Sequence, residues 1–275
     1  MTTALKALQL KARHQVYTLL SGQNLSKLHG EGYDFAELRE YQVGDDIRKI
    51  NWTITAKLGK PYIKELHANR ELSVAVVAFM DGSLYFGTGN NKQKKLTEVA
   101  TLLGYAAQFN DDLFTGICYT QNKTELTPPT KHLYHIDQFS QRLFENSLLG
   151  TKVEIKDSMK DLFKRLYKPS LVFVIGDFLE TVDLSLLAQK HELIAVIIRD
   201  KEEELPVKLG EVVLNDPQTG AKLDTYFGKR SVQKYLAELK KNDEKLVEHF
   251  SQHDIRYVKI FTDEEAVGKL ISLFV

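Results

Sequence analysis

The feature that most constrains this chain is the uninterrupted apolar run 74–80, which ends abruptly in Asp81, Gly82 and Ser83. A strand that is buried on both faces has a continuous run of Val, Ala and Phe rather than an alternating pattern, so the run predicts a central strand of a parallel sheet. In open α/β sheets, ligands bind beyond the carboxyl ends of the strands. Asp81 and Ser83 are therefore the first candidate site residues.

The rest of the chain alternates between apolar runs and segments with helical periodicity. A second long run, 170–176, also ends in an aspartate, Asp177. Runs at 113–119 and 193–198 are separated by stretches in which apolar residues recur every three or four positions. This alternation predicts an α/β fold with a doubly wound, mainly parallel sheet of the Rossmann-like type.

We expect two regions, an N-terminal helix and collar in residues 1–70 and an α/β domain in residues 71–275. The first region begins with a basic amphipathic helix at 5–20, which we expect to pack on the α/β domain. In the second region, a turn signal at 216–220 predicts a β-hairpin insertion at about 200–228.

The charged, glycine-marked stretch 30–52 is expected to form a collar held by ion pairs. Asp45 or Asp46 can cap a short helix that carries Trp52, which we expect to act as the hydrophobic plug of the collar. An alternative interpretation makes the two aspartates a catalytic or metal-binding pair. Adjacent residues of a helix point in different directions, which favours the structural role.

The composition narrows the class of protein. The chain has 37 basic and 37 acidic residues, so its net charge indicates no nucleic-acid partner. Its longest apolar run is far shorter than the roughly 20 residues that span a bilayer. Lys6 and Lys11 interrupt any signal-peptide core, so we expect a cytoplasmic protein. The single cysteine, Cys118, lies in an apolar run and is expected to be buried.

Several common catalytic motifs are absent from the sequence. There is no phosphate-binding P-loop, no Gly-x-Ser-x-Gly around Ser83 and no zinc spacing among the eight histidines. Oxygen ligands remain: Asp81, Ser83 and Asp177 at strand ends, and Thr151 ahead of a helix. Such a set suits a hard cation such as Mg²⁺, although an aspartate at a strand end is also a common helix cap.

One long motif carries a resemblance to a known family. Residues 30–52 read GEGYDFAELREYQVGDDIRKINW, which closely resembles the signature of the bacterial family called domain of unknown function 58. The stretches 200–206 and 216–220 are also similar to that family, so the resemblance extends over nearly the whole chain. Within the motif, Asn51 departs from the pattern, in which an aspartate is common.

That family is similar to von Willebrand factor A domains, whose metal-ion-dependent adhesion site uses aspartates, serines and a threonine. The resemblance implies that Asp81 and Ser83 lie on the first loop of such a site, Thr151 on the second and Asp177 on the third. Tyr85 occupies the position of the second serine and is too long for a compact ligand shell. The resemblance therefore implies a degenerate site for Mg²⁺ or another divalent cation, with one ligand missing.

The resemblance also implies a partner, because members of the family are thought to work with MoxR-type AAA+ ATPases in the assembly or maturation of other proteins. Many members carry amino-terminal membrane helices, and this chain looks like the short, soluble form. Our leading hypothesis is thus a non-enzymatic interaction module, in which an acidic side chain of a partner fills the open coordination position of the cation.

Two other functions stay open. In a metal-dependent hydrolase, Asp81 and Asp177 would hold a water-activating ion, and His132 or His135 would be the candidate general base. In a peripheral membrane-associated scaffold, the basic helix 5–20 would lie on an anionic membrane surface.

Overall fold

The computed structural model describes residues 2–24, 34–67, 72–86, 91–121 and 123–273. The chain divides into two compact units. Residues 1–18 and 72–275 form the first, which we call the main unit, and residues 19–71 form the second, which we call the collar unit.

The main unit contains a six-stranded sheet with the strand order β10-β7-β6-β3-β4-β5. All neighbouring strands are parallel except β4 and β5. The strands are β3 (Ser73–Phe79), β4 (Leu113–Tyr119), β5 (Thr124–Thr130), β6 (Leu171–Gly176), β7 (Glu192–Arg199) and β10 (Arg256–Phe261). The predicted α/β class with a mostly parallel sheet is confirmed, and β3 lies inside the sheet between β4 and β6.

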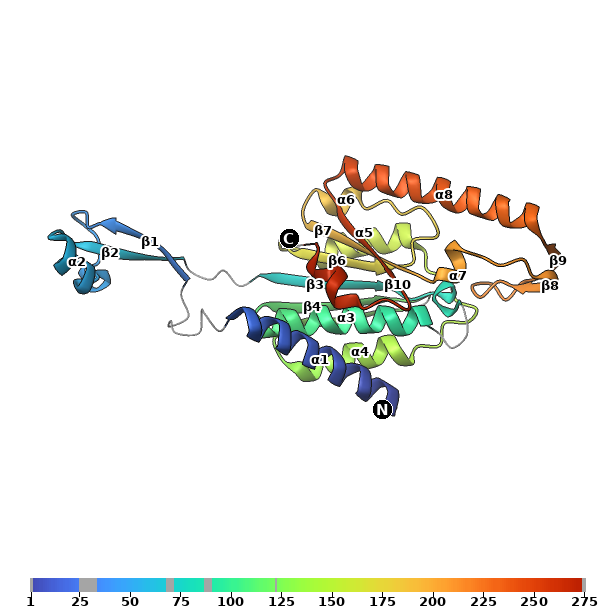
Figure 1. The fold of residues 1–275 in the computed structure, drawn as a ribbon, viewed down its shortest axis with the longest axis horizontal. Coiled ribbons are helices and arrows are strands. Elements are labelled where there is room, and N and C mark those ends of the chain that lie inside the picture. Colours follow the sequence, from blue (N-terminus) through green and yellow to red (C-terminus); the bar gives the residue numbers. More distant parts are fainter. Residues whose placement is uncertain (1, 25–33, 68–71, 87–90, 122, 274–275) are drawn as a thin grey trace. The chain divides into compact units, whose positions relative to one another are not determined.

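Helices cover both faces of this sheet (Figure 1). One layer contains α1 (Thr3–Asn24), α3 (Asn91–Phe109), α4 (Leu133–Glu145) and α9 (Ala266–Ile271); the other contains α5 (Ile155–Arg165), α6 (Ser185–Ala188) and α8 (Lys229–Gln252). Alternate residues of β3, among them Ala75 and Val77, share a buried cluster with Leu162 of α5 and Phe250 of α8. A strand covered on both faces needs apolar side chains at every position, which explains the continuous run.

The start of α1 packs on the main unit, as its apolar face predicts. Leu5 and Ala12 are fully buried. The Nε2 of Gln9 donates to the carbonyl of Asp137 in α4, at 3.2 Å. Within the parts of the chain that the structure describes, none of the helices has the length and apolar character that a membrane span requires.

The predicted hairpin is also present. Its strands β8 (Gly210–Asn215) and β9 (Lys222–Phe227) follow the short helix α7 (Lys201–Glu204) and pair with each other in a separate two-stranded sheet. In the connecting turn, the amide of Gly220 donates to the carbonyl of Asp216 at 2.8 Å, and Gly220 has a φ of +73°. This left-handed conformation favours glycine.

The collar unit contains one strand that the sequence did not predict, and it corrects one expectation. The strand β1 (Asp34–Glu40), which the charged sequence concealed, pairs antiparallel with β2 (Tyr62–His67). The side chain of Trp52, at the start of α2 (Trp52–Leu58), is 68% exposed, so the prediction of a hydrophobic plug was wrong. A unit of this small size has a large surface relative to its volume, so it encloses few large side chains completely.

Polar contacts hold the collar unit locally. Arg39 donates to both carboxylate oxygens of Asp45, at 2.7 and 2.8 Å. Asp46 caps the 3₁₀ helix Ile47–Lys49, so the two adjacent aspartates have separate structural roles. Asn51 accepts a hydrogen bond from the amide of Ile54 at 3.3 Å and thereby caps α2. An aspartate at this position could cap equally well, because both residues are strong N-caps.

Candidate functional site

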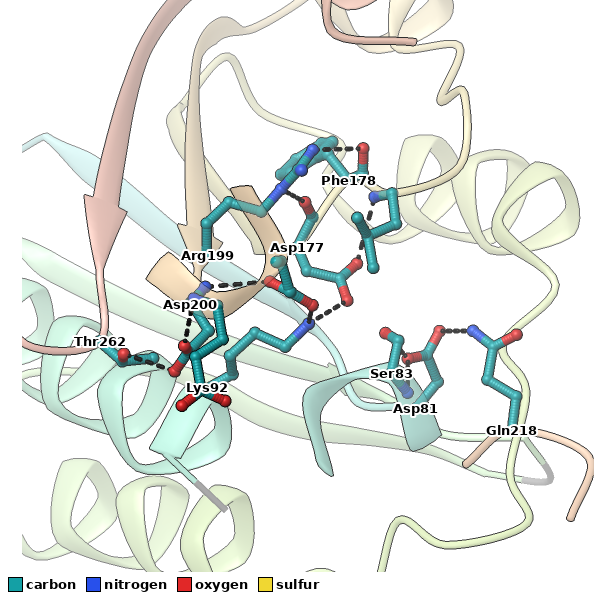
Figure 2. A network of polar contacts seen from close by, with 12 residues as sticks. Asp81, Ser83, Lys92, Asp177, Phe178, Arg199, Asp200, Gln218 and Thr262 are labelled. Atoms are coloured by element: carbon teal, nitrogen blue, oxygen red, sulfur yellow. Dashed lines mark hydrogen bonds and ion pairs between the residues drawn. The ribbon is translucent and has the colours of Figure 1, made fainter. Parts of the chain in front are cut away.

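The first loop of the candidate site follows β3 directly. Asp81 caps a 3₁₀ helix, Gly82–Tyr85. Its Oδ1 accepts hydrogen bonds from the backbone amide of Ser83 at 3.0 Å and from the Ser83 hydroxyl at 2.5 Å. Its Oδ2 accepts a hydrogen bond from Nε2 of Gln218 at 3.3 Å, as Figure 2 shows. Both carboxylate oxygens of Asp81 therefore have protein partners.

Three segments that are distant in sequence meet at this loop. The amide of Gly82 donates to the carbonyl of Thr151 at 2.9 Å, and the amide of Gly150 donates to the carbonyl of Pro217 at 2.8 Å. A Cβ atom on Gly82 would lie only 2.2 Å from the Pro217 carbonyl oxygen. The turn of the β8–β9 hairpin thus packs directly on the Asp81 loop, and only glycine permits this approach. We call residues 81–83, 148–151, 177–179 and 216–220 the rim.

Thr151 joins the rim through its backbone rather than its side chain. Its hydroxyl donates to the carbonyl of Leu148 in its own loop, at 2.6 Å. Tyr85 is at the end of the 3₁₀ helix and is 37% exposed. Of the four predicted site residues, the structure brings the side chains of Asp81, Ser83 and Asp177 together, while Thr151 supplies a carbonyl.

Asp177 follows β6 and meets a buried lysine. Its Oδ2 lies 3.0 Å from Nζ of Lys92, in the first turn of α3, and its Oδ1 lies 3.4 Å from the amide of Leu179. Nζ of Lys92 also lies 2.5 Å from Oε1 of Glu203. Figure 2 shows that Lys92 and Asp177 group with Arg199 and Asp200, whereas Asp81 and Ser83 group with Gln218.

The partners of Lys92 are themselves fixed. Glu203 and Asp200 form a capping box at the start of α7, in which the amide of Asp200 donates to Oε2 of Glu203 at 2.9 Å. The hydroxyl of Thr262, after β10, donates to Oδ2 of Asp200 at 2.7 Å. Arg199 donates from Nε to the carbonyl of Asp177 at 2.7 Å. The end of β6 is therefore tied to α3, α7 and the end of β10.

The two aspartates share one cavity. Asp81 and Asp177 line a small space of about 30 Å³ together with Gln218, Phe79 and Ile155. That volume holds about two water molecules. Burial and the charge of Asp177 raise the pKa of Asp81. Burial also pushes the pKa of Asp177 upward, but the Lys92 ammonium and hydrogen bonds to the carboxylate outweigh it, so this pKa is lowered.

The residues of the rim do not fit a divalent cation as they are arranged. The hydroxyl of Thr151 donates within its own loop and Asp177 already faces a cation, so two of the four predicted ligands are engaged elsewhere, whereas the hydrogen-bonded oxygens of Asp81 keep further lone pairs. Among the residues that the structure describes, no three His, Cys, Asp or Glu side chains form a group suited to a metal ion. The metal prediction stays a prediction.

The two histidines proposed as general bases lie elsewhere. Thr124 of β5 pairs with Tyr119 near the carboxyl edge of the sheet, whereas Thr130 pairs with Phe114 at the opposite edge. His132 and His135 follow Thr130 and begin α4. The topology therefore places them away from Asp81, across the length of the sheet.

Sequence reasoning missed Lys92, Glu203 and Gln218. The stretch 200–206, which includes Glu203, carried a signal because it is similar to the family, but nothing in the sequence connected it with Asp177. Lys92 is one of three lysines within four residues, with Lys94 and Lys95, and the sequence does not distinguish the one that faces Asp177.

Comparison with known proteins identifies the family. Residues 37–245 match the family model described as "Protein of unknown function DUF58". The chain belongs to the DUF58 family. Similar curated relatives include uncharacterized proteins of Mycobacterium tuberculosis and Mycobacterium bovis, each 28% identical over 233 residues, which cover 80% of this chain and 72% of each relative.

Solved structures with a partly similar arrangement belong to other proteins. One is described as conserved hypothetical protein BatB from Bacteroides thetaiotaomicron, with 13% identity, a TM-score of 0.45 and coverage of 74% of this chain and 96% of that one. Another is an aerotolerance-related membrane protein from Bacteroides fragilis, with 12% identity, a TM-score of 0.41 and coverage of 73% and 96%. Agreement at this level has no bearing on the function of the DUF58 chain.

Proposed function

We propose that this DUF58 protein is a non-enzymatic interaction module that docks a partner protein at the rim and along the adjoining hairpin. The observation that carries the proposal is the exposure of the hairpin. Its turn is fixed to the rim, yet apolar side chains on its strands and on the preceding segment are each more than half exposed: Leu205, Val207, Leu209, Val213, Leu223 and Tyr226.

These apolar side chains occupy both faces of the hairpin, because Val213 and Tyr226 share one face and Leu223 lies on the other. A two-stranded hairpin is marginally stable without a covering element, and large exposed apolar patches commonly mark protein interaction sites. The collar unit supports the same class of function, because Val43, Ile47, Trp52 and Leu58 are also more than half exposed.

The chemistry of the rim agrees with binding rather than catalysis. The Ser83 hydroxyl donates to Asp81, but neither candidate histidine is at this edge of the sheet. A serine nucleophile requires a base and a group that orients the base. The hydrolase alternative therefore lacks the general base that the sequence suggested for it, although Asp81 and Asp177 do share a cavity.

The partner that we propose is a MoxR-type AAA+ ATPase, together with a client protein whose assembly or maturation the pair assists. This follows from the family resemblance of the motif at 30–52, as does the proposed relation of the main unit to von Willebrand factor A domains. The proposed location is the cytoplasm, where an ATP-hydrolysing partner would act. Docking through the exposed hairpin needs no divalent cation.

The proposal is tested with the full chain and a purified MoxR-type ATPase encoded in the same genome. Tyr226→Ser and Tyr134→Ser form a matched pair, because the two tyrosines are 67% and 66% exposed and only Tyr226 is on the hairpin. We expect Tyr226→Ser to weaken binding about tenfold or more, as expected for an interface tyrosine, and Tyr134→Ser to leave it unchanged. Equal affinities for both variants, or no binding by the wild-type chain, would contradict the proposal.

A further inference from the structure

We propose that the ammonium group of Lys92 is the resident cation of the rim, which holds Asp177 in place and makes the rim independent of divalent metal ions. This inference goes beyond docking and does not depend on the identity of the partner. It starts from the poor fit between the rim residues and a metal ion.

Lys92 is completely buried and surrounded by groups that stabilise a positive charge. The side chain is 0% exposed, and lysine is almost never fully buried unless it is paired. Nζ lies 3.0 Å from Asp177 and 2.5 Å from Glu203, and it also lies 5.6 Å from the centre of the Phe86 ring. Both carboxylates are buried or nearly so. The ammonium is thus enclosed by the groups that stabilise a cation.

The position of Lys92 in its helix is unfavourable for a cation. It is the second residue of α3, where the partial positive charge of a helix amino terminus disfavours a cation. Packing alone would be served better by an uncharged side chain of similar length. A lysine at this place is therefore explained by the two carboxylates it faces rather than by the helix.

The charges of Lys92, Asp177 and Glu203 leave little place for a second cation. One ammonium and the carboxylates of Asp177 and Glu203 together carry a net charge of −1. A divalent ion bound to Asp177 would have to share that carboxylate with Lys92, and two cations repel each other strongly in a buried site of low dielectric constant. Lys92 therefore competes directly with a metal ion for Asp177.

The ammonium group of Lys92 connects segments that follow different strands of the sheet. A metal ion in a loop-edge site joins loops from different strands. Here Lys92 of α3 contacts Asp177 at the end of β6 (Figure 2). It also contacts Glu203 of α7, which the capping box fixes after β7. The lysine performs this structural task with a covalently attached cation.

The test removes the charge and asks whether a metal ion replaces it. In Lys92→Met, Asp177 and Glu203 lose their counter-charge, and we expect the full chain to gain binding of Mn²⁺ by calorimetry. Mn²⁺ at about 100 times its Kd should raise the Tm of this variant by roughly 5–10 °C. The wild-type chain should show no binding heat and the same Tm in Mn²⁺ and in EDTA.

Two controls separate this role from a merely structural one. Lys95→Met removes another buried lysine of α3, which pairs with Glu98 at 2.7 Å, and should lower the Tm without creating a dependence on Mn²⁺. Asp177→Asn in the Lys92→Met background should abolish the gained binding, because it removes the carboxylate for which Lys92 competes. If Lys92→Met does not fold, Lys92→Met/Glu203→Gln restores the net charge of −1 and is tested in the same way.

The results that would overturn the inference are distinct from those that bear on docking, since no partner is present. Binding of Mn²⁺ by the wild-type chain that disappears in Asp81→Asn would show that Lys92 does not replace a metal ion. Variants that gain no Mn²⁺ dependence, or that fail to fold with and without Mn²⁺, would show that another cation cannot take its place.

Discussion

Replacing Gly82 with alanine should detach the hairpin turn from the rim. The new Cβ atom would lie 2.2 Å from the carbonyl oxygen of Pro217 and 2.7 Å from the amide nitrogen of Gln218. Both neighbours are backbone atoms, so the turn itself must move, by more than about 1 Å, before an ordinary contact distance is restored.

The cost follows from the contacts that this movement breaks. The hydrogen bond from Gly150 to Pro217 is short, at 2.8 Å, and the contact from Gln218 to Asp81 is longer, at 3.3 Å. At about 1 kcal/mol for each good hydrogen bond, we expect the free energy of unfolding to fall by about 1–2 kcal/mol.

The assay combines urea denaturation with amide hydrogen exchange. Gly82→Ala should speed exchange at the amides of Gly150 and Gln218, because the first donates to Pro217 and the second donates to Asp216 within the turn. Gly268→Ala is the control: this glycine lies in α9, and a Cβ atom added to it would meet no neighbouring atom within 4 Å. It should be neutral or stabilising, because alanine is the better helix former.

A Gly82→Ala variant with wild-type stability and unchanged exchange at Gly150 would refute the packing of the turn on the Asp81 loop. The same variant should also weaken partner docking if the hairpin must be held at the rim. A loss of docking without a change in exchange would point to a direct contact at Gly82 instead.

Three further predictions concern other parts of the molecule. Burial raises the pKa of the Cys118 thiol to about 12, so a disulfide reagent such as DTNB should label this single cysteine only on unfolding; rapid labelling of the native chain would contradict its burial. Burial lowers the pKa of His191, so the unfolded state takes up a proton before the folded state does as the pH falls. The free energy of unfolding should therefore decline below about pH 6.5. His191→Phe should reduce this decline in denaturation curves measured across that range. Asn51→Ala should destabilise α2 by about 1 kcal/mol and speed exchange at the amide of Ile54, whereas Asn51→Asp should preserve both; equal effects would exclude the capping role.

Much of the fold could be predicted because the burial of a strand determines which of its positions must be apolar. β3 and β6 are covered on both faces, and each appears as an unbroken apolar run. β5 was missed because Pro128 and Pro129 argue against a strand, yet an edge strand tolerates proline. β1 was missed because its sequence, DFAELRE, is rich in charged residues and does not alternate between apolar and polar positions.

The site could be predicted only where a strand end determines position. Asp81 and Asp177 were found because parallel strands deliver their last residues to the same edge. The pairing of Asp177 with Lys92, and of Asp81 with Gln218, depends on contacts between residues 85 and 137 positions apart. No local pattern encodes such contacts, since they arise only when α3 and the hairpin turn pack against the rim.

The most direct test of the account is the titration of Asp81, because its central claim is that Asp81 and Asp177 share one cavity. Side-chain carboxyl NMR of the full chain should give a pKa for Asp81 above its usual value of 3.8, raised by burial and by the charge of Asp177. In Asp177→Asn that pKa should fall toward 3.8. An Asp81 titration at its usual value, or one that Asp177→Asn does not change, would contradict the claim.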